Sequence, residues 1–230
     1  FPMGAVISLG GCTASFVSPE GLVVTNHHCA RGSVQFNSTE LNNYLVDGFL
    51  AADRAGELKA APGTRVYVTT RVEDVTGRVA AALTAEMNPR ARYQAIEDTR
   101  KALIAQCEAP GGLRCQVASF YGGASYRLIE RREIRDVRLV YAPGDNVGKY
   151  GGDIDNWLWP RHTGDFAFYR AYVAPDGTPA DYDEANVPYR PKHHLKVSRA
   201  GLDDGDFVMA AGHPGTTRRY ARLSAVANTF

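Results

Sequence analysis

Short runs of β-branched residues, separated by turn residues, open this chain. Residues 4–8, 13–17 and 22–26 form three such runs, with Gly10-Gly11 and Ser18-Pro19-Glu20-Gly21 between them. β-Branched side chains favour strands, whereas Gly and Pro favour tight turns, so this spacing predicts a β-meander. Many short strands of this kind favour a β-barrel over a parallel sheet.

Runs of the same composition recur later in the chain. They cover residues 66–70, 115–121, 126–129, 137–141, 165–173 and 206–212. We expect the run at 165–173 to end in the turn Pro175-Asp176-Gly177. We expect the run at 206–212 to be a buried strand that His213-Pro214-Gly215 closes. The predicted fold class is therefore mainly β, with short helical segments.

Residues 79–108 have a different composition, dominated by Ala, Leu, Glu, Arg, Lys and Gln. Asn88-Pro89 places a capping residue directly before a first-turn proline. Apolar residues from Tyr93 to Ile104 roughly follow a helical repeat. The pattern predicts a helical excursion near 79–108, with a helix that begins near Asn88.

Composition and charge exclude several classes of protein. The 230 residues are 44% hydrophobic and 22% charged, which is ordinary for a globular protein. The net charge of +1 gives no electrostatic basis for binding nucleic acid or an anionic membrane surface. No apolar run approaches the ~20 residues that span a bilayer. No signal peptide is visible at Phe1, which is compatible with its earlier removal.

The chain has four cysteines, Cys12, Cys29, Cys107 and Cys115. None belongs to a C-x-x-C pair, which disfavours a zinc knuckle or a thioredoxin-like site. We expect disulfides Cys12–Cys29 and Cys107–Cys115, although four buried free thiols are the alternative. Disulfides would indicate an oxidising compartment such as a periplasm, or secretion.

The sequence Val-Val-Thr-Asn-His27-His28-Cys29 ends one of the predicted strands. It resembles the histidine segment of chymotrypsin-like serine peptidases, in which a cysteine directly follows the catalytic histidine and pairs with one on the preceding strand. That pattern makes His28 the general base and leaves His27 as a structural or substrate-side neighbour. The alternatives are two satisfied polar groups or a metal pair. Adjacent side chains on an extended segment point in opposite directions, so the two histidines would chelate one metal poorly.

Residues 151–166 read Gly-Gly-Asp-Ile-Asp-Asn-Trp-Leu-Trp-Pro-Arg-His-Thr-Gly-Asp-Phe. Asp165 follows a glycine at the head of an apolar strand, which suits the carboxylate that orients a catalytic imidazole. Alone, Asp165 would be an ordinary turn aspartate, and its pairing with His28 decides otherwise. Asp153 and Asp155 are rivals, but their segment does not lead directly into a strand.

Taken together, the Thr-Asn-His-His-Cys segment and residues 151–166 resemble the serine-peptidase family that contains bacterial dipeptidyl-peptidase 7, dipeptidyl-peptidase 11 and dipeptidyl aminopeptidase BII. The resemblance implies a chymotrypsin-like double β-barrel, with a large helical domain inserted in the part of the chain that forms the second barrel. It implies periplasmic, homodimeric exopeptidases that release dipeptides from a free peptide N-terminus without a metal or other cofactor. The triad histidine and aspartate match His28 and Asp165.

The same resemblance matches Asn156 and Trp157 to the pair that holds the α-amino group of the substrate. An amide carbonyl can accept hydrogen bonds from a terminal ammonium, and an aromatic face can attract it. The alternatives are that Asn156 is a turn former and that Trp157 is a core aromatic.

The chain lacks a serine in a Gly-x-Ser-Gly turn, and Gly123-Ala124-Ser125-Tyr126 comes nearest. In the resembling family the serine lies far downstream, beyond the helical insertion. We therefore expect residues 1–200 to form the first barrel with the His and the Asp, and residues 201–230 to open the second barrel and the helical insertion. The chain is then a fragment, inactive alone, whose partner is the C-terminal part of the same protein.

Other functions remain open from sequence. The same barrels could serve a trypsin-like endopeptidase, or the chain could be a non-catalytic peptide-binding fragment or a complete protein that lost catalysis. A metal site at His193-His194 with His27 is disfavoured, because these positions lack ligand spacing.

Overall fold

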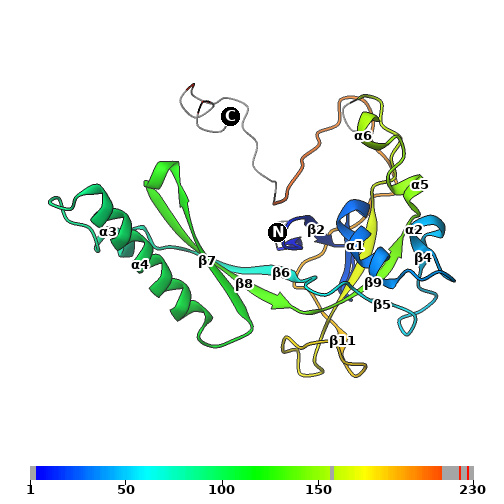
Figure 1. Ribbon diagram of the computed structural model, residues 1–230, viewed down its shortest axis with the longest axis horizontal. Coiled ribbons are helices and arrows are strands. Elements are labelled where there is room, and N and C mark those ends of the chain that lie inside the picture. The colour runs from blue at the N-terminus through cyan, green and yellow to red at the C-terminus, as the bar shows by residue number, and fades with distance from the viewer. Residues whose placement is uncertain (1–3, 156–157, 214–222, 224–226, 228–230) are drawn as a thin grey trace.

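The computed structural model describes residues 4–155, 158–213, 223 and 227 (Figure 1). Its strands pair into one antiparallel sheet in the order β4-β9-β10-β3-β2-β1-β6-β8-β7, with β11 on β10 and β5 on β9. The strands are β1 (Val6–Ser8), β2 (Thr13–Phe16), β3 (Leu22–Thr25), β4 (Phe49–Leu50), β5 (Leu58–Lys59), β6 (Val66–Asp74), β7 (Leu113–Phe120), β8 (Ser125–Ile134), β9 (Asp136–Ala142), β10 (Ala167–Val173) and β11 (Val187–Pro188). The helices are α1 (His27–Asn37), α2 (Tyr44–Asp47), α3 (Thr76–Ala80), α4 (Pro89–Glu108), the 3-10 turn η1 (Tyr121–Gly123), α5 (Asp145–Gly148) and α6 (Gly152–Asp155).

The predicted N-terminal meander is present as β1, β2 and β3. Ala14 lies opposite Ile7 on one side and Thr25 on the other, so the three strands are in direct register. Their inward side chains join those of α1, β9 and β10 in the main core, which includes Ile7, Phe16, Val23, Val34, Ile134, Leu139 and Tyr169. This core supports the ends of β3 and β10, where the candidate site lies.

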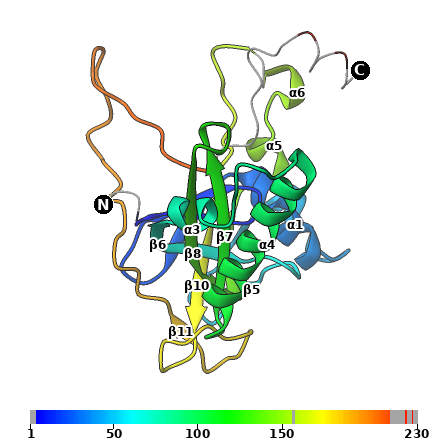
Figure 2. The ribbon, with the colours of Figure 1, turned by 90° about the vertical axis from the view of Figure 1, so that its left-hand side faces the viewer.

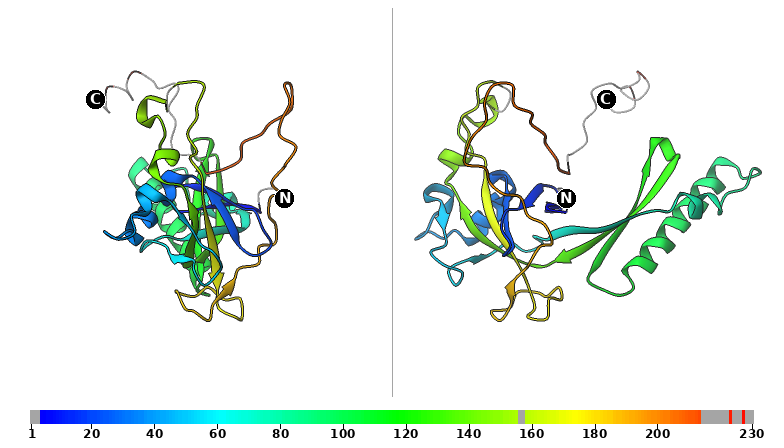
Figure 3. Two further views of the ribbon diagram at one scale, coloured as in Figure 1. Left: turned by 90° about the vertical axis from the view of Figure 1, so that its right-hand side faces the viewer. Right: turned by 180° about the vertical axis from the view of Figure 1, so that it is seen from behind.

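Strands β6, β8 and β7 leave this core as a long arm that carries α3 and α4 (Figures 1 and 3). The arm has its own core of Val75, Val79, Leu103, Val117, Tyr126 and Leu128. Helix α4 lies along the β7–β8 hairpin (Figure 2), and Cys107–Cys115 ties its end to β7. Asn88 caps α4 by accepting from the backbone of Ala91, as Asn88-Pro89 predicted. The predicted helical excursion contains two helices, α3 and α4, because residues 81–88 between them are not helical.

The expectation of a buried strand at residues 206–212 is wrong within the described chain. This segment is in no strand, and Phe207, Val208 and Met209 are 90%, 66% and 68% exposed. A strand requires a hydrogen-bonded neighbour, and no described residue pairs with this segment. The backbone N–H of His213 donates to Thr13 Oγ1 at 2.7 Å, which holds the end of the segment near β2. The opening of the helical insertion, expected within residues 201–230, falls mostly outside the described residues, because only residues 223 and 227 are described beyond 213.

Within the described part of the chain, no helix has both the length and the apolar composition that crossing a bilayer requires.

Candidate active site

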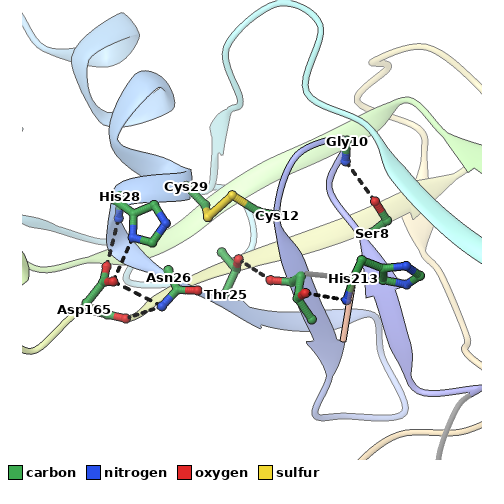
Figure 4. The surroundings of a disulfide bond; sticks show 10 residues. Ser8, Gly10, Cys12, Thr25, Asn26, His28, Cys29, Asp165 and His213 are labelled. Carbon is green, nitrogen blue, oxygen red and sulfur yellow. Dashed lines mark hydrogen bonds and ion pairs between the residues drawn. A yellow bond between two sulfur atoms is a disulfide. The ribbon is translucent and has the colours of Figure 1, made fainter. Parts of the chain in front are cut away.

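The site forms where the end of β3 meets the start of β10. These two strands pair antiparallel, with Ala167 opposite Thr25, so the residues after Thr25 lie beside the residues before Ala167. Helix α1 starts at His27 directly after β3, and Asp165 precedes β10 (Figure 4). Strand pairing therefore brings His28 and Asp165 together, although they are 137 positions apart in the chain.

Asp165 accepts hydrogen bonds on both of its carboxylate oxygens (Figure 4). His28 Nδ1 lies 2.7 Å from Oδ2, and the backbone N–H of His28 donates to Oδ1 at 3.0 Å. Asn26 Nδ2 donates to Oδ2 at 3.1 Å. A carboxylate can only accept, so Nδ1 of His28 carries the proton and the neutral ring has its lone pair on Nε2.

The surroundings of Asp165 keep it ionised. Burial raises the pKa of Asp165, but the bonds from the backbone and ring of His28 and from Asn26 outweigh burial and hold that pKa below its ordinary value. The side chain of Asp165 is 29% exposed, whereas that of His28 is 63% exposed. The arrangement is a fixed carboxylate behind an imidazole that solvent and substrate can reach, which is the geometry of a general base and its orienting group.

His28 and Asp165 line a cleft of about 470 Å³. The segment from Gly148 to Asp153 and the residues Arg161 and Thr163 form most of its other wall. No serine belongs to this lining among the described residues. The cleft can accept and move a proton. The Thr163 hydroxyl in its wall donates to the carbonyl of Tyr150, and the described chain places no serine there.

The disulfide Cys12–Cys29 fastens the first turn of α1 to the segment that leads into β2 (Figure 4). His27 and His28 were expected on an extended strand end, and this expectation is wrong because both lie in the first turn of α1. They still face different surroundings, since His27 is fully buried. The disulfide is formed, as is Cys107–Cys115, so the described chain has no free cysteine.

A metal does not fit beside His28. The ligand atoms of Cys12, His28 and Cys29 lie within 4.8 Å of one another, but the two sulfur atoms are bonded to each other and neither is a thiolate. Among the described residues, His27, His193 and His194 belong to no group of potential ligands.

The remaining predicted residues have mixed outcomes. Asn156 and Trp157 lie outside the described residues, between Asp155 and Leu158. Asp153, a rival of Asp165, lines the cleft, but the carboxylate that hydrogen-bonds His28 is that of Asp165. Sequence reasoning missed Asn26, which was assigned to the end of a strand. The signal was present, because Asn directly before a helix is a common capping residue, but here its side chain holds Asp165 and not the helix.

Comparison with known proteins gives consistent results. The family model described as Peptidase S46 matches residues 1–230. An Asp/Glu-specific dipeptidyl-peptidase of Shewanella putrefaciens is 55% identical over 220 residues, which are 96% of this chain and 30% of that relative. A dipeptidyl-peptidase 7 of Capnocytophaga gingivalis is 41% identical over 213 residues, which are 92% of this chain and 29% of the relative.

Solved crystal structures of a dipeptidyl-peptidase are also similar to this chain. The crystal structure of Porphyromonas endodontalis DPP11 in complex with substrate superposes with a TM-score of 0.80 at 40% identity, and covers 89% of this chain and 31% of that chain. A second structure of the same protein, with the dipeptide Arg-Glu, gives a TM-score of 0.77 at 39% identity, with the same coverage of both chains. The chain thus spans about 30% of the length of the curated relatives that it matches.

Proposed function

This chain belongs to the peptidase S46 family, and on that basis we propose that the protein is a serine exopeptidase that releases dipeptides from the free N-terminus of peptides. The observation that carries the proposal is the contact between His28 and Asp165 at the wall of an open cleft. Relatives that match over more than 90% of this chain are named dipeptidyl-peptidases, which supports the substrate class.

In this mechanism Nε2 of His28 takes the proton of a serine hydroxyl as the oxygen attacks the scissile carbonyl and forms a tetrahedral intermediate. The imidazolium then gives its proton to the leaving amine as the C–N bond breaks, which leaves the dipeptide as the acyl group on the serine. His28 next takes a proton from a water molecule that attacks this ester, and it returns the proton to the serine oxygen as the dipeptide is released. Asp165 keeps the proton on Nδ1 and stabilises the imidazolium. The serine and the oxyanion hole are proposed to lie in a C-terminal part of the same protein, which completes the cleft around His28.

Two residues of this chain are proposed to limit cleavage to dipeptides. Asn156 and Trp157 follow α6 in the sequence, and the first two residues of α6, Gly152 and Asp153, belong to the cleft wall. An amide oxygen and an aromatic face are groups that can bind the α-ammonium group of a substrate. Recognition of a charged terminus two residues from the scissile bond distinguishes an exopeptidase from an endopeptidase.

The finer architecture remains part of the proposal. Residues 1–200 are proposed as the first barrel of a chymotrypsin-like pair, and residues 201–230 as the opening of the second barrel and of a large helical insertion. The protein is proposed to be a homodimer. A periplasmic or secreted location is proposed, and two formed disulfides support it because such bonds persist in oxidising compartments.

A preference for acidic substrates is proposed as well. The relative with 55% identity is named Asp/Glu-specific; three others of that name are 41–42% identical, and relatives named dipeptidyl-peptidase 7 are 40–41% identical. Dipeptidyl substrates that end in Asp or Glu should therefore be cleaved with higher kcat/KM than matched substrates that end in Leu.

The test uses the longest natural form of the protein and one peptide in two states, with a free and with an acetylated N-terminus. Release of a dipeptide from the free peptide alone supports the proposal. Equal cleavage of both would instead identify an endopeptidase. Failure to release dipeptides and to react with a covalent serine probe would identify a non-catalytic protein. The 230-residue chain alone should release no dipeptide, because its described cleft has no serine.

A further inference from the structure

His27 is a buried titratable residue that the proposed chemistry does not use. Its side chain is fully buried beside the exposed His28, and neither ring nitrogen makes a hydrogen bond of good geometry with a described residue, although the backbone of Pro143 and the carboxylate of Asp145 interact with the ring. Burial lowers the pKa of His27, and the carboxylates of Asp145 and Asp165 and the backbone of Pro143 only partly oppose this. A polar ring whose nitrogens are poorly hydrogen-bonded in such a place costs free energy, whereas an apolar residue would not.

The ring of His27 lies between α1 and α5. It packs directly against Gly148, where even the methyl group of an alanine would overlap the ring. Its Nε2 is 3.6 Å from Asp145 Oδ1 at the start of α5. Arg31, one turn further along α1, donates to the same carboxylate from Nε and from Nη2, the latter at 2.9 Å. Helix α5 is thus held against α1 by the ring of His27 and by an ion pair.

Helix α5 in turn supports the segment that presents Asp165. The carbonyl of Val147 accepts from the backbone N–H of Gly164 at 3.0 Å. The hydroxyl of Thr163 donates to the carbonyl of Tyr150 at 2.6 Å. A continuous set of contacts therefore runs from His27 through Gly148 and Val147 to Gly164, which is the neighbour of Asp165.

We propose that His27 is a positioning residue, whose ring sets the separation of α5 from α1 and thereby the geometry of the bond between Asp165 and His28. The two adjacent histidines then act on one carboxylate from two sides, His28 by direct contact and His27 through α5. The inference rests on the proposed function for its kinetic consequence, but the geometric part does not depend on it.

The test is a double-mutant cycle at His27 and Gly148. Gly148→Ala adds a methyl group that pushes against the ring, and His27→Ser removes the ring. Each single change should lower kcat of the longest natural form, by up to roughly 10²-fold for a displacement near 1 Å, with KM little changed. The double variant should recover part of the loss, because the methyl group then occupies space that the ring has left.

Gly32→Ala is the matched control. In contrast to Gly148, a methyl group added at Gly32 would meet no neighbouring atom within 4 Å, and Gly32 lies on the same helix α1 as His27. This variant should keep wild-type kcat. Single variants that fold, as circular dichroism reports, and keep wild-type kcat would overturn the proposal, as would losses that simply add in the double variant. If Gly148→Ala does not fold, His27→Ser and His27→Phe replace it, and a kcat of wild-type size in both overturns the proposal.

A second readout separates this inference from the proposed function. The proton that Nδ1 of His28 shares with Asp165 should give a low-field proton resonance in the longest natural form, and observing it requires no catalytic turnover. The resonance should be present in the wild type and in Gly32→Ala, weaken in His27→Ser and return in part in the double variant. If the longest natural form releases no dipeptide but this pattern appears, the proposed function fails and the positioning role stands. An unchanged resonance in folded His27→Ser and Gly148→Ala would overturn the positioning role itself.

Discussion

His28 donates to both oxygens of Asp165, from Nδ1 across 2.7 Å to Oδ2 and from its backbone N–H across 3.0 Å to Oδ1. The second bond satisfies a backbone donor in the first turn of α1, where Asn26 makes no capping bond. Asp165 therefore caps the helix and orients the imidazole with one side chain. The position of the ring and the start of the helix are fixed by the same contact.

Replacement of Asp165 by Asn should abolish most activity of the longest natural form. The amide has nearly the shape of the carboxylate, but its NH₂ group would favour the wrong tautomer of His28. We expect kcat to fall by roughly 10⁴-fold, with KM little changed. Steady-state kinetics on a dipeptidyl substrate measure both constants.

Asp153→Asn is the matched control for that experiment, since Asp153 lines the same cleft and is exposed. The control should keep kcat close to the wild-type value. If Asp153→Asn lost as much activity as Asp165→Asn, the orienting role would have to be shared or reassigned between the two carboxylates.

Stability should depend on acid through Asp165. Its pKa is lowered in the folded chain relative to the ordinary value of 3.8, so folding favours the ionised form. The stabilisation is fully present above about pH 4 and is lost as pH falls through the folded pKa. The difference in unfolding free energy between wild type and Asp165→Asn should be largest near pH 7 and shrink below pH 4. Urea denaturation at a series of pH values measures it, and a difference that grows in acid would contradict the assignment.

The two disulfides should contribute similarly to stability but differently to activity. Cys12–Cys29 closes a loop with a sequence separation of 17, and Cys107–Cys115 one of 8. The chain-entropy relation gives roughly 3 and 2.5 kcal/mol. Replacement of both cysteines of either disulfide by serine should lower the unfolding free energy by about the corresponding amount.

Only the pair at 12 and 29 should also lower kcat, because Cys29 adjoins His28 and Cys107–Cys115 lies in the arm. Denaturant titration and kinetics on both variants measure these effects. Equal losses of kcat in the two variants would show that the first disulfide acts on stability alone.

Local patterns in the sequence predicted much of this structure. Alternation and turn residues located β1 to β3, and Asn88-Pro89 located α4, because those signals lie within a few residues of one another. The pairing of His28 with Asp165 was predicted from motifs, and strand pairing across 137 positions is what brings the two residues together. The predictions of these features are confirmed because the local preference of the sequence and the long-range packing favour the same structure.

The sequence predictions fail where contacts between residues far apart in the chain determine the local structure. Helix α1 begins at His27 in a sequence with no side-chain cap, and it is instead fixed by Asp165 and by the disulfide of Cys29, both of which are long-range. The apolar run at 206–212 has strand composition but no paired neighbour within the described chain. The role of Asn26 was missed for the same reason, since its partner is 139 positions away.

Asn26 should contribute to activity through its hydrogen bonds to Asp165. Its Nδ2 donates to Asp165 Oδ2 at 3.1 Å and to the Asp165 carbonyl at 3.3 Å. A hydrogen bond to a charged group contributes about 1.5 kcal/mol, so Asn26→Ala should lower kcat about tenfold if that energy appears in the transition state. Asn43→Ala is the control, because Asn43 is exposed and its side chain caps nothing at α2.

Asn26→Asp separates the hydrogen bond from the charge. It keeps the size of the side chain but places a second carboxylate beside Asp165, and like charges raise each other's pKa. The pKa of Asp165 should then rise from its lowered value, which carboxyl-carbon NMR titration measures. Activity should fall further than in Asn26→Ala above pH 6, where both carboxylates are ionised. Equal losses of kcat in the two variants would show that the lost hydrogen bond, and not the added charge, sets the effect. Wild-type kcat in Asn26→Asp beside a loss in Asn26→Ala would show that Asn26 acts only through packing.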